Sequence, residues 1–145
     1  MNLEKNREVM IENQLRPNKI TNSNVLQAFM NTSKEQFISD DKINICYSDQ
    51  DISIKDRRGY LKNLHLAQIL HFADIKNNEK VLHIGGLTGY LSVLIAKLCK
   101  KIYVTDSGQA LVDGINKNFS NNVVANCEVL KQEFSEGLKI RGPYY

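Results

Sequence analysis

The first part of the chain alternates apolar and polar positions at helical spacing. Residues 3–16 carry an apolar stripe, and Pro17 is expected to end the helix that this stripe predicts, because proline lacks the donor that a helix interior needs. A second short helix is expected over residues 25–30, after several N-cap candidates at residues 20–24. The sequence therefore predicts a set of short amphipathic helices at the N-terminus.

A polar stretch over residues 39–59 interrupts this helical pattern. Just before it, Ser33 is followed three residues later by Gln36, which has the form of a capping box and predicts a further helical turn. Within the stretch, residues 52–54 predict a short strand and residues 55–59 predict a turn or loop. This charged loop is interpreted as a solvated connector, with a role in shaping a substrate cleft as the alternative.

The second part of the chain alternates short apolar runs with helical patterns. The expected elements are a helix from about residue 61, a strand at 81–84, a helix at 89–99, a strand at 102–105, a helix capped by Ser107 and a strand at 127–131. Strands that alternate with helices favour a parallel sheet with right-handed crossovers. The sequence therefore predicts an α/β fold for this part.

Composition and charge narrow the classes of function. The chain has 145 residues, of which 42% are apolar and 24% are charged, as in ordinary globular domains. The net charge is only +3 and the lysines are scattered, so no nucleic-acid partner is expected. No stretch reaches the roughly 18 apolar residues of a membrane span, and the polar N-terminus has no apolar signal core. A cytoplasmic protein with no membrane partner is expected.

The cysteines and histidines do not form a recognisable ligand set. Cys46, Cys99 and Cys127 are widely spaced, with no CxxC pair and no histidine at ligand spacing. They are interpreted as small apolar fillers in a reducing compartment, rather than as disulfide partners or zinc ligands. His65 and His71 lie on the helical pattern after residue 61 and are interpreted as structural. No metal site is therefore expected.

The stretch with the clearest chemistry is residues 81–90, where a short apolar strand stops at a glycine cluster and a helix begins. Gly85, Gly86 and Gly89 are three of the eight glycines, and Asp106 follows Gly85 by 21 residues, at the end of the next strand. Strand, glycine turn, helix, strand and acid is the layout of a nucleotide-binding βαβ unit, in which the acid accepts hydrogen bonds from a ribose diol. A glycine turn that binds nothing is the alternative.

The spacing within the turn separates the classes of cofactor. A dinucleotide turn has glycines at its first, third and sixth positions, where this chain has Gly85, Leu87 and Tyr90. A phosphate-binding P-loop needs Gly-Lys-Ser/Thr, and the sequence has no such tripeptide. A cofactor without phosphates remains, and S-adenosylmethionine is the natural candidate.

Several separate segments resemble one family in the right order. They are the run Met-Ile-Glu-Asn-Gln-Leu-Arg-Pro-Asn at 10–18, Phe37, Tyr47-Ser48-Asp49, Asp51-Ile52 and the glycine stretch 81–90. Over about residues 8–145 the chain resembles the protein-L-isoaspartate O-methyltransferases, which are class I S-adenosylmethionine-dependent methyltransferases, and it looks most like their divergent alphaproteobacterial branch.

This resemblance implies a fold and a division of the chain. The implied fold is an α/β, Rossmann-like class I methyltransferase fold, a parallel sheet flanked by helices that is incomplete at the C-terminus, with an N-terminal helical cap. The implied domains are a helical cap with a substrate-side loop at 1–60 and a partial S-adenosylmethionine-binding domain at 61–145. A homo-oligomer or a missing C-terminal segment is expected to cover the open sheet edge.

The resemblance also implies an activity and a site. The family methylates the α-carboxyl of L-isoaspartyl residues in damaged proteins, so the expected partner is a protein or peptide with isoaspartyl residues and the expected cofactor is S-adenosyl-L-methionine. The residues expected to bind the cofactor are His83, Gly85, Gly86, Thr88, Gly89, Asp106 and Glu133. No catalytic residue is assigned. The alternative is a degenerate or truncated cofactor-binding module without transfer activity.

The chain departs from the family pattern in two of its motifs. His83 stands where the cofactor motif has an acid, and Leu87 stands where it has its second glycine. Gly59 and Leu61 stand where better-characterised members carry the two hydroxyls of Thr-Ile-Ser-x-Pro. The substrate-side residues of the family are therefore not transferred to this chain.

Overall fold

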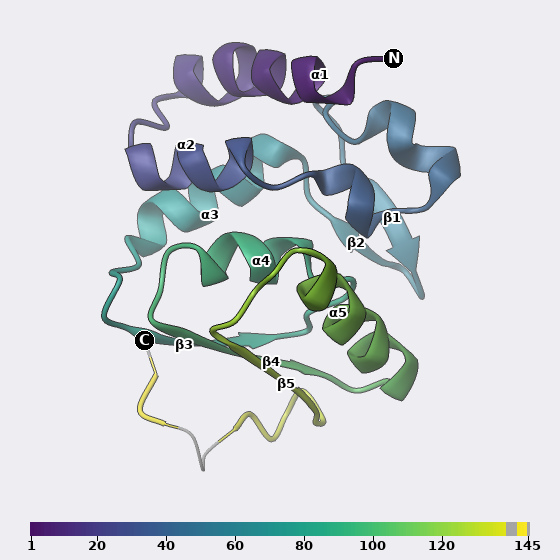
Figure 1. Cartoon of the computed structure of the whole chain (residues 1–145), viewed down its shortest axis with the longest axis vertical. Helices are drawn as coiled ribbons and strands as arrows, with labels where there is room; N and C mark the ends of the chain where they lie inside the picture. The colour runs from purple at the N-terminus through teal and green to yellow at the C-terminus, as the bar shows by residue number, and fades with distance from the viewer. Residues whose placement is uncertain (139–141, 145) are drawn as a thin grey trace. The chain divides into compact units, whose positions relative to one another are not determined.

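The computed structural model describes residues 1–138 and 142–144, and Figure 1 shows the course of the chain. The chain divides into two units, Met1–Asp74 and Ile75–Tyr145. The boundary expected from the sequence lay after residue 60, whereas this division keeps the helix at 63–73 with the N-terminal unit.

Short helices and a hairpin make up the described part of the first unit. Its helical elements are α1 (Leu3–Met10), the π-helical turn η1 (Ile11–Leu15), α2 (Ser23–Met30), α3 (Asn63–Ala73) and the 3-10 turns η2 (Arg16–Asn18), η3 (Lys34–Phe37) and η4 (Asp40–Ile45). Its strands are β1 (Ile52–Lys55) and β2 (Arg58–Tyr60). Buried side chains such as Met10, Leu15, Phe29 and Leu70 form its core where α1, η1, α2 and α3 meet.

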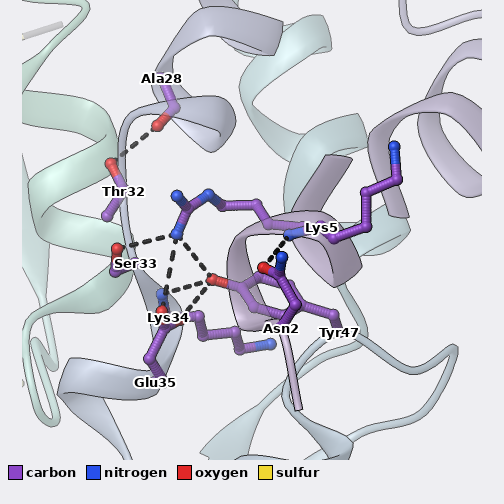
Figure 2. Close-up of polar contacts among 9 residues, drawn as sticks. Asn2, Lys5, Ala28, Thr32, Ser33, Lys34, Glu35 and Tyr47 are labelled. Atoms are coloured by element: carbon purple, nitrogen blue, oxygen red, sulfur yellow. Dashed lines mark hydrogen bonds and ion pairs between the residues drawn. The ribbon is translucent and has the colours of Figure 1, made fainter. Parts of the chain in front are cut away.

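The N-terminal helix changes its winding before it ends. Asn2 caps α1 by accepting a hydrogen bond from the Lys5 N–H at 2.9 Å, as Figure 2 shows. The helix continues through the wider η1 turn, and η2 contains Pro17 in its first turn, where a missing N–H is tolerated. Lys19 then adopts a left-handed conformation with φ 65°. The helix expected over residues 3–16 is confirmed, with its second half wound as π and 3-10 turns.

The capping box expected at Ser33 is wrong. Residues 34–37 do form a helical turn, but within the described residues the Ser33 side chain makes no cap to it. The Ser33 hydroxyl instead accepts a hydrogen bond from Arg7 Nη1 at 2.8 Å. A partner 26 positions away in the sequence therefore takes the place of the local cap.

β1 and β2 form an antiparallel hairpin. Its turn is made by Asp56 and Arg57, both with positive φ (52° and 61°), which suits the twist of a tight hairpin. The strand expected at 52–54 is confirmed, while β2 was expected as loop. A Cβ at Gly59 would lie 2.2 Å from Ile52 O, so any residue with a side chain at this position would push the two strands apart.

The described part of the second unit holds a parallel sheet in the order β3-β4-β5. Its elements are β3 (Lys80–Ile84), α4 (Tyr90–Ala96), β4 (Lys101–Asp106), α5 (Gln109–Asn121) and β5 (Cys127–Lys131). The register pairs Ile84 with Thr105 and Thr105 with Leu130, so the carboxyl ends of the strands lie at one edge. The expected alternation of strands and helices around a parallel sheet is confirmed.

The two crossover helices of this unit pack against the same face of the sheet. His83 of β3 lies against Ser92 of α4, and its register partner Val104 of β4 lies close to Ile115 of α5. This arrangement follows from two successive right-handed crossovers that step in the same direction.

Two features of this unit were not predicted from the sequence: the residue at the start of α5 and a contact on the opposite face of the sheet. The N-cap position of α5 is occupied by Gly108, which has no side chain to cap the helix. The cap expected at Ser107 is therefore wrong. On the opposite face, Tyr103 meets Tyr144 edge-on, with ring centroids 5.8 Å apart. The last described residues therefore pack on β4.

No helix among residues 1–138 and 142–144 combines the length and apolar character needed to cross a membrane. All three cysteines lie in this part of the chain and are free thiols; Cys46 and Cys99 are buried, as expected for apolar fillers, and Cys127 is half-buried. Burial raises the pKa of Cys46 and of Cys99 to about 11, so these thiols stay protonated at neutral pH. Within the same residues, no group of three His, Cys, Asp or Glu side chains is placed to hold a metal ion.

Candidate functional site

The turn between β3 and α4, residues 85–89, is held to the neighbouring strand by its backbone. The N–H groups of Gly85 and Gly86 both donate to Thr105 O, at 2.8 and 3.1 Å, and the Gly89 N–H donates to Gly86 O at 2.9 Å. Gly85 and Gly89 have φ values of 84° and 97°, in the region that favours glycine. The glycines therefore allow a tight turn at the carboxyl edge of the sheet.

Gly86 is explained by packing inside the protein. A Cβ at this position would lie 2.4 Å from Val104 Cγ1 and 2.8 Å from Ile115 Cδ1. Carbon atoms in contact lie about 3.5–4.0 Å apart, so any side chain here would displace the side chains of Val104 and Ile115. The sequence predicts that a ligand lies close to the backbone of Gly86. In the structure, side chains of the protein's own core lie there instead.

Leu87 holds the backbone conformation of a glycine. Its φ is 58°, and only 3% of its surface is exposed. The left-handed region costs a residue with a side chain about 1–2 kcal/mol. Full burial of a leucine side chain contributes about 1.5–3 kcal/mol, which is enough to offset that cost. The turn therefore keeps its shape because the leucine side chain is buried.

Asp106, at the end of β4, is enclosed by this turn. Its Oδ2 accepts a hydrogen bond from the Leu87 N–H at 3.0 Å, and its Oδ1 accepts one from the Ser107 N–H at 2.9 Å. The exposed fraction of Asp106 is 0%. In this conformation the carboxylate binds the protein's own backbone. A ribose diol could reach these oxygens only after the turn had moved, because the carboxylate is fully buried.

His83 and Thr88 are both held by side chains of the helices. His83 Nδ1 lies at hydrogen-bonding distance, 2.7 Å, from Oγ of Ser92, which is buried in α4. The Thr88 carbonyl accepts a hydrogen bond from Asn118 Nδ2 of α5 at 2.7 Å. Neither Ser92 nor Asn118 was singled out from the sequence, because each acts across elements and belongs to no local motif.

Glu133 lies in the loop after β5 and is exposed. Its neighbour Gln132 donates its backbone N–H to Asp106 O at 3.0 Å, which continues the strand pairing one step beyond the sheet. The structure therefore brings together, at one edge, the glycine turn, Asp106 and the segment that carries Glu133. His83, in contrast, is directed toward α4.

A polar cluster in the first unit joins α1 to two distant segments (Figure 2). Tyr47 OH donates to Glu35 Oε2 at 2.5 Å and accepts from the Lys34 N–H at 3.0 Å. Arg7 Nη1 donates to Ser33 Oγ at 2.8 Å and to Tyr47 OH at 3.3 Å. Burial and the hydrogen bond to Glu35 raise the pKa of Tyr47 far above its usual range, so its hydroxyl stays a neutral donor. The cluster is therefore interpreted as structural.

A cavity of about 230 Å³ lies at the hairpin of the first unit. Asp51, Arg57, Arg58 and Tyr60 are among the residues that line it. This is the charged loop for which a cleft-forming role was the alternative interpretation. The residues that line this cavity carry both signs of charge.

The chain matches known proteins along nearly its whole length. The model of the family described as Protein-L-isoaspartate(D-aspartate) O-methyltransferase matches residues 4–145. A protein-L-isoaspartate O-methyltransferase of Petrotoga mobilis is 25% identical over 119 residues, which cover 82% of this chain and 56% of that protein. The enzyme of the same name from Brucella anthropi is 27% identical over 143 residues, covering 99% of this chain and 65% of that protein. The chain thus spans about half to two thirds of the length of these relatives.

Solved structures show the same fold. A protein-L-isoaspartate O-methyltransferase structure superposes with a TM-score of 0.79 at 15% identity, over 97% of this chain and 45% of that one. A Plasmodium falciparum protein assigned to the same activity, solved with S-adenosyl-L-homocysteine, superposes with a TM-score of 0.73 at 16% identity, over 94% of this chain and 65% of that one. The sheet is that of the Rossmann-like class I methyltransferase fold. The chain belongs to the protein-L-isoaspartate(D-aspartate) O-methyltransferase family.

Proposed function

We propose that this chain provides the S-adenosylmethionine-binding part of an enzyme that methylates the α-carboxyl of L-isoaspartyl residues in proteins. The observation behind the proposal is the meeting of the glycine turn, Asp106 and the Glu133 segment at the carboxyl edge of a parallel sheet. Ligands of open α/β sheets bind at that edge. The family match over residues 4–145 and the S-adenosyl-L-homocysteine in the Plasmodium falciparum structure support the choice of ligand.

The proposed roles of the site residues follow from their places at this edge. Gly85, Gly89 and the Thr88 backbone would border the ligand, and Glu133 would accept hydrogen bonds at its adenine end. The role proposed for Asp106, binding the ribose diol, requires a different conformation of the turn from the one described. His83 is directed toward α4, so its contribution would be to hold the turn through Ser92.

Methyl transfer to a carboxylate needs little chemical activation by the protein. When bound, S-adenosylmethionine supplies a methyl group on a positively charged sulfonium. The thioether that remains after transfer is the leaving group. A carboxylate is already a competent nucleophile, so the protein's part is to position the acceptor. The proposed acceptor is a protein or peptide with an isoaspartyl residue, and a cytoplasmic location is proposed with it.

A second function is favoured by one observation. Because Asp106 is enclosed and Leu87 replaces a glycine, the chain could keep the fold as a module that binds the ligand weakly and transfers no methyl group. Both functions predict some affinity for the ligand. Only an assay of methyl transfer therefore distinguishes this alternative from the first function.

Two measurements test the proposal. Calorimetric titration with S-adenosyl-L-homocysteine should show binding that weakens in Glu133→Gln and is unchanged in Glu136→Gln, a matched control because Glu136 is an exposed glutamate of the same loop. Gly85→Val is a poorer probe, because a φ of 84° would strain valine and disturb the fold itself. No heat at millimolar ligand would contradict ligand binding altogether.

The transfer step needs its own assay. The chain should transfer labelled methyl from S-adenosylmethionine to a peptide with an isoaspartyl residue, and not to the same peptide with an ordinary aspartyl residue. Binding without transfer would support the module without activity. Equal transfer to both peptides would contradict the proposed substrate.

A further inference from the structure

The carboxylate of Asp106 is closed off by a residue of the turn itself. Both of its oxygens accept backbone hydrogen bonds, from Leu87 at 3.0 Å and from Ser107 at 2.9 Å, and its exposed fraction is 0%. The bond from Ser107 comes from the adjacent residue and can persist when the turn moves. The bond from Leu87 crosses from the turn to β4 and holds the turn over Oδ2, so the turn must move before a ligand can reach this buried oxygen.

The residue that makes this crossing bond is itself buried in a strained conformation. Leu87 has a φ of 58° and an exposed fraction of 3%. Moving it away from Asp106 relieves the unfavourable φ but brings an apolar side chain into water. The second effect opposes opening, because burying a leucine is worth more than the left-handed region costs.

We propose that Leu87 keeps the turn closed over Asp106 and thereby sets the affinity of this chain for an adenosyl ligand. The inference rests on the proposed function, because it concerns the same ligand and the same turn. A glycine at this position has no side chain to expose and adopts positive and negative φ values about equally well. The turn would therefore open at little cost in free energy. Leu87 is thus a residue that tunes affinity, and the closed turn is a low-affinity form.

The test compares affinities for S-adenosyl-L-homocysteine by calorimetry, with the full 145-residue chain. Leu87→Gly should bind about threefold to tenfold more tightly than the wild type, the ratio that remains when the relief of the left-handed conformation is subtracted from the cost of exposing a leucine side chain. Leu87→Ala keeps the strained Cβ but removes most of the apolar surface, so opening relieves strain at little cost and this variant should bind at least as tightly as Leu87→Gly. This variant also tests the inference if Leu87→Gly does not fold, as judged by circular dichroism.

Val123 offers a matched control in the same unit. It is a non-glycine residue with a similar positive φ, 54°, but 88% of its surface is exposed and it follows α5 rather than the glycine turn. Val123→Gly relieves the same kind of backbone strain without touching Asp106. Its affinity for S-adenosyl-L-homocysteine should equal that of the wild type.

The outcomes separate the inference from the function on which it rests. Tighter binding by Leu87→Gly and Leu87→Ala, with Val123→Gly unchanged, supports it. Equal binding by the wild type and both Leu87 variants overturns the inference and leaves the proposed function standing. A gain of the same size in Val123→Gly also overturns it, since the cause would then be a general effect of strain. If no variant binds at millimolar ligand, the inference and the proposed function both fail.

Discussion

Lys34 and Asn63 are joined by a hydrogen bond in the interior of the first unit. Lys34 Nζ donates to Asn63 Oδ1 at 2.8 Å, and both residues have an exposed fraction of 0%. Asn63 Nδ2 in turn donates to Cys46 O at 3.0 Å, and the ring centroid of Tyr60 lies 6.0 Å from the ammonium. Burial lowers the pKa of Lys34 from 10.5 to about 8. The unit therefore contains a lysine that titrates near physiological pH.

The pKa of Lys34 predicts how stability depends on pH. Between pH 8 and 10.5 the unfolded chain keeps the lysine proton and the folded chain has lost it, so the free energy of unfolding rises with pH. From pH 7 to pH 9 the gain should be about 1 kcal/mol. Cys46 and Asp51 are the charged or titratable groups that act on Lys34, and the thiol pKa of Cys46, about 11, lies above this range.

The measurement is urea unfolding of the wild type and of Lys34→Met at pH 7, 8 and 9. Methionine is close in length and cannot titrate, so the difference between the two proteins isolates Lys34 from the other groups. This difference should shift by about 1 kcal/mol in favour of the wild type as the pH rises. A difference that stays constant from pH 7 to pH 9 would show that Lys34 does not titrate there.

Removing the Tyr47 hydroxyl should destabilise the first unit. Tyr47→Phe takes away the donor to Glu35 and the acceptor for the Lys34 N–H and Arg7 Nη1. Leaving buried polar groups unsatisfied costs about 1–3 kcal/mol, so a loss of about 2 kcal/mol is expected in urea unfolding. The control is Glu12→Gln, which breaks the exposed ion pair with Arg16 and should cost less than about 0.5 kcal/mol. Equal losses for the two variants would contradict the burial argument.

Gly86 and Gly114 should respond in opposite ways to alanine. Gly86→Ala places a Cβ 2.4 Å from Val104 Cγ1 and should cost about 2 kcal/mol through overpacking. In α5, a Cβ at Gly114 would meet no atom of the described residues within 4 Å, so Gly114→Ala should stabilise the chain by about 0.5–1 kcal/mol. Thermal unfolding of both variants checks the pair. A neutral Gly86→Ala would mean that this glycine is not fixed by packing.

Asn126 should matter more than its place in a loop suggests. Its Nδ2 donates at 2.8 Å to the carbonyl of Ala96, the last residue of α4, and at 3.1 Å to the carbonyl of Cys99 in the turn that follows. Asn126→Ala should cost about 1 kcal/mol, and Asn126→Asp should cost more because a carboxylate would face carbonyl oxygens at the negative end of a helix. Asn121→Asp, an exposed change at the last residue of α5, is the control: it places the same charge at the negative end of a helix without a buried contact, so it should cost only about 0.3–1 kcal/mol, less than Asn126→Asp. Urea unfolding that ranks alanine below aspartate in stability would contradict this account.

The sequence predicted the second unit well because its signals are local. Apolar runs such as 102–105 and 127–131 carry the strand pattern within a few residues, and each is separated from the next by a helical pattern. The structure gives β4 as Lys101–Asp106 and β5 as Cys127–Lys131, close to these ranges. Periodicity and turn residues fix such elements without any information about the rest of the chain.

The details that failed are those decided by distant partners. Ser33 has the form of a cap but binds Arg7, and Ser107 precedes a helix that it does not cap with its side chain. The sequence placed Asp106 correctly at the end of a strand, yet could not show that the backbone of Leu87 would occupy its carboxylate. These relationships depend on tertiary packing, which no pattern within a short window records.

The order of the strands in the second unit bears on how the chain folds. Since β3, β4 and β5 lie side by side in the order in which they are synthesised, each strand finds its neighbour one helix back along the chain. The paired residues lie 21 positions apart between Lys80 and Lys101 and 25 apart between Ile102 and Cys127, so pairing loses less loop-closure entropy than joining opposite ends of the chain would. This sheet can therefore grow one strand at a time as the polypeptide leaves the ribosome, with Asp106 in place before the strand that follows it has been made.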